Sequence, residues 1–263
     1  MTNIEHISCV IIVKNAKETM ANVLDALCYF DDVVVYDNGS DDGTQEIAAA
    51  YSNVNLVNGP FLGFGETKQR AATYAKHDWV LSLDADEVLA DDFVQGLMSL
   101  KLNDQNVYSI TRSNFYKDRE VKHCWGKDII VRLYNRSQTD FNSSKVHELI
   151  VTDGFKIEAL QGVVRHYPYQ NISQFIIKLD KYSSLFAEDK QGIKRSSPLK
   201  AFLNGGFSFF KTYLLKRGFM DGSAGLIIAF SHMATNFYKY MKLYELNKLA
   251  ASDRSNKEES HDR

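Results

Sequence analysis

The sequence predicts an α/β fold in which a mostly parallel sheet is flanked by helices and followed by a C-terminal helical extension. Apolar, β-branched runs recur along the first hundred residues, at Ile7–Val13, Asp32–Tyr36, Val54–Val57 and Trp79–Leu83. Segments with helical spacing of apolar residues separate these runs, and strands that alternate with helices form parallel sheets. Polar, ligand-like residues directly follow three of the four runs, which indicates a binding site at one edge of the sheet.

The remaining elements follow in chain order. Between the four predicted strands the apolar spacing predicts helices over 18–30, 44–51 and 66–76, and a fourth helix over 92–100. Beyond residue 100 the pattern becomes less regular. We expect strands over 107–115, 129–133 and 163–167, and helices over 173–189, 199–217 and 223–246.

The charge is unevenly distributed. Residues 1–193 carry a net charge of −8, whereas residues 194–248 hold nine Lys or Arg and two acidic residues. The three cysteines have no metal-type spacing, and an odd count fits a reducing compartment. No signal peptide and no run of about 18 apolar residues is visible. We therefore expect a cytoplasmic protein whose basic C-terminal part contacts something anionic.

Three strand ends carry the polar residues. Lys14 and Asn15 follow the first strand, a stretch from Asp37 to Thr44 follows the second, and Asp84-Ala85-Asp86-Glu87 follows the fourth. Alternation along a strand places Asp84 and Asp86 on one face, where their oxygens suit Mg²⁺ or Mn²⁺. The competing interpretations are a solvated turn before a helix for the acidic cluster and an Asx-turn for Asp37.

These residues carry a family resemblance. VVVYDNGSDDGT at 33–44, followed by WVLSLDADE at 79–87, resembles the family-2 glycosyltransferases of the GT-A fold. GFGETKQRAA, RLYNR, VHE at 146–148 and LLKRGFMDGSAGL resemble the bacterial lipopolysaccharide-core β-glucosyltransferase subgroup over nearly the whole chain. The resemblance implies a Rossmann-like GT-A sheet. It also implies an inverting, metal-assisted transfer of a hexose, with glucose as first choice, from a UDP-sugar to a lipopolysaccharide-core or related glycolipid or polysaccharide acceptor.

The resemblance implies a donor site. Asp37 would accept a hydrogen bond from the uracil imide N–H, and Asn15 lies at the neighbouring strand end. Lys68 and Arg70 follow Gly63 and Gly65, so their cations could meet the phosphates. An exposed basic helix face is an equal alternative for Arg70.

It also implies a metal site and a base. Asp86 would bind Mg²⁺ or Mn²⁺, Asp84 would share the metal or hold the ribose, and His166 would be a third ligand, with a structural histidine as the alternative. Glu87 is left open between a supporting role and a helix start, and His147 could contact the phosphate. Glu148 and Asp128 are the two candidates for the base that deprotonates the acceptor. The E-D and Q-x-x-R-W motifs of processive relatives are missing, which argues against a polysaccharide synthase.

The domain organisation follows from these assignments. Residues 1–190 are predicted to form the GT-A domain, with residues 1–100 binding the nucleotide sugar and 101–190 on the acceptor side. Residues 191–250 form a basic, aromatic helical extension, and 251–263 a disordered tail. The helices within 199–246 are compatible with contact to the inner face of the plasma membrane, or with packing on the body or another subunit.

Two other functions stay open at this point. A nucleotide-sugar nucleotidyltransferase shares the sheet and the metal, but it usually needs a glycine-rich loop where this chain has Lys14-Asn15-Ala16-Lys17. A non-catalytic, membrane-peripheral sugar-nucleotide-binding protein would not need intact Asp37, Asp84 and Asp86. Nucleic acid is not an expected partner, and the oligomeric state is left open.

Overall fold

The computed structural model describes residues 3–143 and 148–261, and the chain divides into two compact units. Unit 1 comprises residues 1–115 and 127–168, and unit 2 comprises residues 116–126 and 169–263. The predicted boundary at residue 190 therefore differs from the observed one. The helix over 172–190 belongs with the C-terminal helices, because it packs against the last of them.

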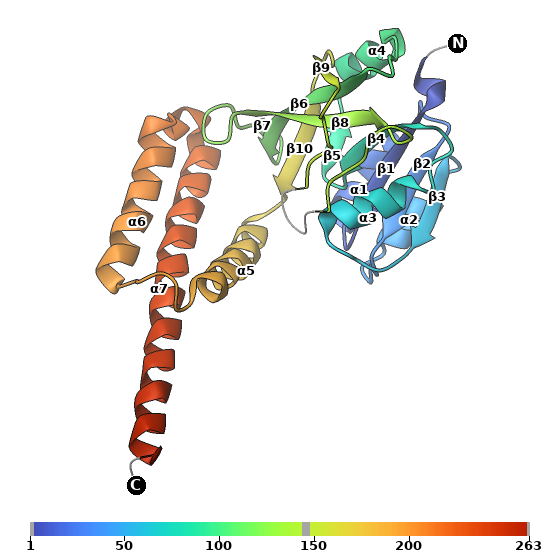
Figure 1. The fold of residues 1–263 in the computed structure, drawn as a ribbon. Coiled ribbons are helices and arrows are strands. Elements are labelled where there is room, and N and C mark those ends of the chain that lie inside the picture. The colour runs from blue at the N-terminus through green and yellow to red at the C-terminus, as the bar shows by residue number, and fades with distance from the viewer. Residues whose placement is uncertain (1–2, 144–147, 262–263) are drawn as a thin grey trace. The chain divides into compact units, whose positions relative to one another are not determined.

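Unit 1 is built on a mixed sheet whose first half is parallel (Figure 1). Four parallel strands lie side by side in the order β3 (Val54–Asn58), β2 (Val33–Asp37), β1 (Ile7–Val13) and β4 (Trp79–Asp84). The sheet continues with β8 (Lys127–Asn135), β6 (Asn106–Tyr116), β10 (Val164–Tyr169) and β5 (Glu87–Leu89), and β9 (Lys156–Ala159) pairs with β6. The predicted α/β fold with a mostly parallel sheet is confirmed.

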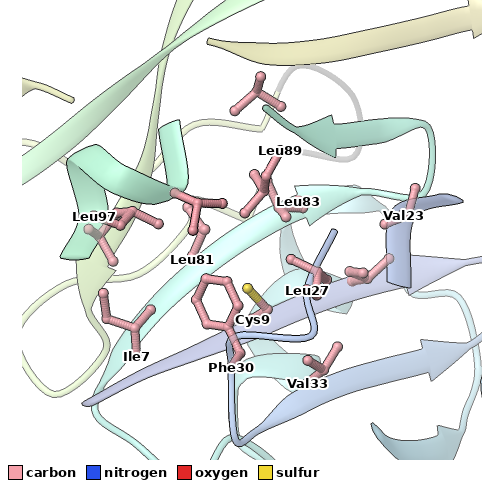
Figure 2. Close-up of a cluster of buried hydrophobic side chains, with 14 of the residues drawn as sticks. Ile7, Cys9, Val23, Leu27, Phe30, Val33, Leu81, Leu83, Leu89 and Leu97 are labelled. Atoms are coloured by element: carbon pink, nitrogen blue, oxygen red, sulfur yellow. The ribbon is translucent and has the colours of Figure 1, made fainter. Parts of the chain in front are cut away.

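Helices connect the parallel strands, and apolar side chains fill both faces of the sheet. The connecting helices are α1 (Lys17–Asp25), α2 (Thr44–Ala49) and α3 (Phe64–Ala72). The short helix η1 (Asn3–His6) precedes β1, and α4 (Asp91–Ser99) lies between β5 and β6. On one face Ile7 and Cys9 pack with Leu27 and Leu81 (Figure 2). On the other face Val10 packs with Val34, Val80 and Tyr134. Burial on both faces explains the continuous apolar runs of β1, β2 and β4.

The short strand β5 was not predicted from the sequence. Glu87–Leu89 pairs antiparallel with β10, so that Glu87 lies opposite His166. The pairing turns the chain back directly after β4 and brings β10 alongside the acidic cluster. It therefore positions residues that are far apart in the sequence at the same edge of the sheet.

Unit 2 is helical. It contains α5 (Ile172–Lys190), α6 (Pro198–Phe210), a π-turn η2 (Lys211–Leu215), a short helix η3 (Gly218–Asp221) and α7 (Gly222–His261), together with a hairpin that holds β7 (Arg119–Glu120). The structure continues α7 through His261, where the sequence predicts a disordered tail. Lys, Glu and Ala in that segment are good helix formers, which is consistent with the continuation. Among the described residues, no helix combines the length and apolar character needed to cross a membrane.

Asp221 ties the 116–126 hairpin to the start of α7. Its buried carboxylate accepts hydrogen bonds from the backbone amides of Lys122 (3.1 Å), His123 (3.0 Å) and Cys124 (2.8 Å), and it lies 2.8 Å from Nδ1 of His123. Burial alone would raise the pKa of Asp221, but the hydrogen bonds from His123 and the amides hold it below its ordinary value.

We expect Asp221→Ala to lower the free energy of unfolding by about 3 kcal/mol, because three backbone amides, of which that of Cys124 is buried, lose a buried charged acceptor. Denaturant unfolding measures this change, and Glu245→Ala, an exposed change on α7, is the matched control. Since the folded pKa is depressed, the stabilisation is present above about pH 4 and is lost as the pH falls through the folded pKa. Equal stability of the two variants at neutral pH would contradict this role.

Candidate active site

The loops after β1 and β2 are joined at the carboxyl edge of the sheet. The side-chain oxygen of Asn15 accepts a hydrogen bond from the backbone N–H of Asp41 (3.0 Å), and the backbone N–H of Asn15 donates to Oγ of Ser40 (2.8 Å). Asn15 has φ of 56°, a left-handed conformation that Asn tolerates better than most residues. The predicted donor-site residue Asn15 thus fixes the loop that follows Asp37.

Asp37 ends β2 with its side chain fully buried. Its Oδ1 accepts hydrogen bonds from the backbone amides of Gly39 and Ser40 (both 2.7 Å) and from Nε2 of Gln45 (3.0 Å). Oδ2 has no donor among the residues that the structure describes. One oxygen therefore caps the turn, as the Asx-turn interpretation predicted. The other is a buried acceptor of the kind that normally has a partner.

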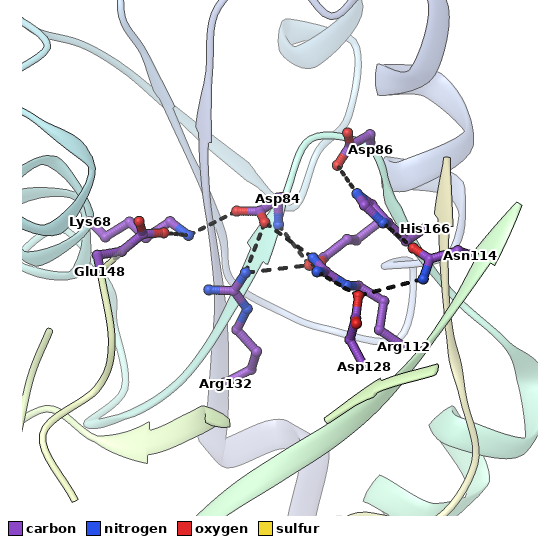
Figure 3. A network of polar contacts seen from close by, with 10 residues as sticks. Lys68, Asp84, Asp86, Arg112, Asn114, Asp128, Arg132, Glu148 and His166 are labelled. Carbon is purple, nitrogen blue, oxygen red and sulfur yellow. Dashed lines mark hydrogen bonds and ion pairs between the residues drawn. The ribbon is translucent and has the colours of Figure 1, made fainter. Parts of the chain in front are cut away.

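Asp84 lies at the centre of a network of charged side chains (Figure 3). Its Oδ1 accepts from Nζ of Lys68 (2.8 Å) and its Oδ2 from Nη2 of Arg132 (2.8 Å), with Nη1 of Arg112 at 3.9 Å. Burial alone would raise the pKa of Asp84, but the positive charges of Arg132 and Lys68 hold it well below its ordinary value. Asp84 is therefore ionised, and both of its oxygens are bound by cations.

Glu87 is fully buried beneath this network. It accepts from Nη1 of Arg112 (2.9 Å) and, through its second oxygen, from the backbone N–H of Asp84 (2.9 Å). Burial and the neighbouring charge of Asp84 raise the pKa of Glu87. Because α4 begins only at Asp91, Glu87 is not a helix-start carboxylate. Its two oxygens hold the guanidinium of Arg112 and the backbone at the end of β4 in place.

Asp86 points away from this network and toward His166. Oδ1 of Asp86 lies 3.6 Å from Nε2 of His166, and Nδ1 of His166 lies 2.7 Å from Oδ1 of Asn114. Asn114 donates from its Nδ2 to Asp128 (3.4 Å), so its amide oxygen faces the histidine. That arrangement places the proton of a neutral His166 on Nδ1 and leaves the Nε2 lone pair on the side of Asp86. The hydrogen-bond partner of His166 is thus the side-chain amide of Asn114.

The donor atoms of Asp86 and His166 fit a divalent cation. A carboxylate oxygen and an imidazole nitrogen whose second nitrogen is held by a hydrogen bond are common ligands of such ions. No group of three or more His, Cys, Asp or Glu side chains within 3–143 and 148–261 is arranged to hold a metal. Mg²⁺ commonly uses one or two protein ligands and takes the rest from phosphate and water. Asp84 fits this set less well, because both of its oxygens are bound by Lys68 and Arg132.

Lys68 links the centre of the network to one of the candidate bases. Its buried ammonium donates to Oδ1 of Asp84 and to Oε1 of Glu148, each at 2.8 Å. The cation predicted for the phosphates is thus engaged by two carboxylates. Arg70 is exposed on α3, and no contact found among the described residues joins it to the network. His147 lies outside the described residues.

The two candidate bases occupy different parts of the network (Figure 3). Glu148 contacts Lys68 and its side chain is 14% exposed. Asp128 is 43% exposed and is bound by Nη2 of Arg112 (3.1 Å) and by Asn114. Both carboxylates belong to unit 1 and lie in the same network as Asp84, but they are held by different cations.

Three residues of the site were not assigned from the sequence: Arg112, Asn114 and Arg132. Arg112 and Asn114 lie on β6, and Arg132 lies on β8, inside the run Ile129–Leu133. A charged residue within an apolar strand needs a partner, and that signal could have identified Arg132. The β6–β8 ladder also shifts register between Tyr108 and Ser109, next to Arg132, and such irregularities re-aim side chains near active sites.

Comparison with known proteins identifies the family. A family model described as glycosyl transferase family 2 matches residues 8–162. An uncharacterized glycosyltransferase of Rickettsia typhi is 30% identical over 257 residues, covering 92% of this chain and 87% of the relative. The lipopolysaccharide core biosynthesis glycosyltransferase LpsC of Rhizobium meliloti is 26% identical, covering 93% of this chain and 94% of LpsC.

The chain is also similar to a crystal structure of S. aureus TarS in complex with UDP-GlcNAc, with a TM-score of 0.46 and 13% identity over 86% of this chain and 89% of that chain. The family match favours the predicted glycosyltransferase over the nucleotidyltransferase and the non-catalytic binding protein. Since the family model spans more than half of the residues, the chain belongs to glycosyl transferase family 2 and is a glycosyltransferase.

Proposed function

We propose that this enzyme transfers a hexose, with glucose as first choice, from a UDP-sugar to a lipopolysaccharide-core or related glycolipid acceptor, with inversion and with the help of Mg²⁺ or Mn²⁺. The observation that carries the proposal is the pairing of Asp86 with the Nε2 side of His166 at the carboxyl end of β4. The acceptor class is supported by the similarity to LpsC, which is named for lipopolysaccharide core biosynthesis.

The donor would be recognised at both ends of its diphosphate. Oδ2 of Asp37 is an acceptor without a described donor, and the imide N–H of uracil supplies one. Asp86 and His166 would hold the divalent ion. When bound, that ion offsets the negative charge that grows on the leaving diphosphate. Asp84 would position two side chains: its salt bridges hold Lys68 and Arg132 at the edge of the sheet where the donor would lie.

The transfer itself needs a base on the acceptor side. We assign this role to Glu148, with Asp128 as the alternative. The carboxylate removes the proton of the acceptor hydroxyl while the new bond forms at the anomeric carbon, and the bonding electrons of the broken C–O bond leave with UDP. Glu148 is favoured by the resemblance of VHE at 146–148 to the lipopolysaccharide-core subgroup. The described contacts engage one oxygen of each carboxylate, Oε1 of Glu148 through Lys68 and Oδ2 of Asp128 through Arg112 and Asn114.

Asp37→Asn tests the uracil contact without dismantling the turn. The substituted side chain keeps an acceptor oxygen for Gly39, Ser40 and Gln45, and it turns the unpartnered oxygen into a donor that opposes the uracil N–H. We expect UDP to bind about 30-fold more weakly with an unchanged melting temperature, because two donors then face each other. Calorimetric titration of UDP measures this, with the exposed Asp41→Asn as control. Wild-type affinity in Asp37→Asn would exclude the contact.

A panel of UDP-sugars tests the function as a whole. The purified chain is incubated with each donor and Mn²⁺ or Mg²⁺, first without acceptor and then with truncated lipopolysaccharide. We expect slow UDP release without acceptor for one preferred donor and faster release with the acceptor. Failure to bind or release any UDP-sugar would contradict the assignment of the donor.

A further inference from the structure

Helix α6 exposes large apolar side chains along one face. Phe202 (67% exposed), Leu203 (59%) and Phe207 (62%) lie on it, between Leu199 (67%) and Phe210 (45%). Their spacing of three and four residues places them on one side of the helix, and Leu214 in the following π-turn is also exposed (47%). We call these six residues the α6 apolar face. A helix of a water-soluble domain normally turns such a face inward.

The opposite side of α6 fixes this orientation. Its buried residues are the small Ala201 and Gly205, and α6 packs against α7 in the same unit (Figure 1). A Cβ at position 205 would lie only 3.1 Å from the carbonyl oxygen of Met233 and 3.2 Å from Cβ of Phe237. Asn236 on α7 also donates to Oγ of Ser208 (2.9 Å). Since close packing needs the small residues on the inside, the phenylalanines stay outside.

The surroundings of the α6 apolar face are cationic. Residues 194–220 contain six Lys or Arg and no Asp or Glu. The next acid, Asp221, is buried and bound by the backbone amides of the hairpin. Arg195, Lys211 and Lys216 are exposed on this segment. The surface therefore combines exposed aromatic and aliphatic side chains with positive charge that no carboxylate of the same segment offsets.

We propose that the α6 apolar face inserts into the interface of an anionic lipid membrane. Helices that lie in the interface bury aromatic and aliphatic residues at the level of the headgroups while Lys and Arg meet the lipid phosphates. A second copy of this chain is a poorer occupant, because a symmetric contact would bring two cationic segments together. The proposal goes beyond sugar transfer and depends on none of the residues that we assign to the donor site, the metal site or the base.

The test uses the full chain with vesicles and without sugar nucleotide, metal or acceptor, so its result is independent of the proposed function. We expect the protein to co-sediment with vesicles of phosphatidylcholine and phosphatidylglycerol and to stay in solution with phosphatidylcholine alone. The triple variant Phe202→Ser, Phe207→Ser, Phe210→Ser should bind at least about tenfold more weakly. Lys211→Glu with Lys216→Glu should also lose about tenfold or more, and added salt should weaken the wild type.

Tyr29→Ser with Ile157→Ser is the matched control, since both residues are exposed apolar side chains of unit 1. This double variant should bind vesicles as the wild type does, and circular dichroism should show that every variant is folded. Absence of wild-type binding to anionic vesicles overturns the proposal. The proposal is also overturned if two results occur together: the wild type is a dimer in solution that the triple variant converts to a monomer, and the triple variant binds vesicles as the wild type does.

Discussion

Asp86→Asn is expected to lower kcat/KM for sugar transfer by about 100-fold or more. Asp86 would supply the carboxylate ligand of a cation that stabilises charge on the leaving UDP, and losing such stabilisation costs several kcal/mol of the barrier. The Asn side chain has the same shape, and within the described residues the Asp86 side chain contacts His166 alone, so the fold should be unaffected. Steady-state kinetics with saturating Mn²⁺ measure the loss of sugar transfer. Calorimetric Mn²⁺ titration measures the loss of metal affinity.

The controls for this prediction come from the same part of the chain. Asp91→Asn, at the exposed start of α4, should keep full activity and Mn²⁺ affinity. His166→Gln should weaken Mn²⁺ binding in the same direction as Asp86→Asn, because both side chains would bind the ion. Near-normal transfer and Mn²⁺ affinity in Asp86→Asn would remove the metal site from the proposal.

Glu148→Gln is expected to lower kcat by about 100-fold or more and to leave the binding of the UDP-sugar intact. A positioned base contributes about 10² to 10⁴ in rate. The amide oxygen of Gln can still accept from Lys68, so the network around Asp84 should keep its geometry. Single-turnover transfer measures the chemical step, and calorimetric titration of the donor measures binding.

Asp128→Asn distinguishes the two candidate bases. Its amide oxygen can still accept from Arg112, so we expect near-normal transfer if Glu148 is the base. The reverse result, in which Asp128→Asn stops transfer and Glu148→Gln does not, would move the assignment to Asp128. Equal, small effects in both variants would leave neither carboxylate as the base.

The first half of the fold could be predicted because its signals are local. The apolar runs of β1, β2 and β4 and the polar residues at their ends are contiguous in the sequence, and parallel order follows from the alternation with helices. Asp37 and Asp86 were assigned to the site in this way. Even the turn-capping interpretation of Asp37 is consistent with the structure, since one oxygen caps the turn and the other has no donor within the described part of the chain.

The partners of Asp84 could not be predicted, because they depend on strand pairing over long sequence separations. Arg132 reaches Asp84 only since β8 runs antiparallel beside β4, and a shift in the β6–β8 register lies next to it. Lys68 was interpreted as a phosphate ligand because its glycine-rich neighbourhood is a local signal. Its two carboxylate partners are 16 and 80 residues away.

The boundary of the units was misjudged for a related reason. The spacing of apolar residues predicts a helix over 173–189, but spacing does not reveal which neighbour covers the apolar side. In the structure α5 packs against α7, and residues 116–126 join the same unit through Asp221. Membership of a unit depends on tertiary contacts that the local pattern does not contain.

The salt bridge between Lys68 and Glu148 has a consequence for how enzymes of this kind diversify. The proposed base is anchored by α3, the helix between the parallel strands β3 and β4, and not only by the stretch between β8 and β9 that carries it. That stretch can therefore accumulate substitutions while the carboxylate stays in place. With residues 101–190 on the acceptor side, as we propose, acceptor preference and the chemical step would be separable traits. Relatives could then evolve toward new acceptors and retain the ability to transfer a sugar.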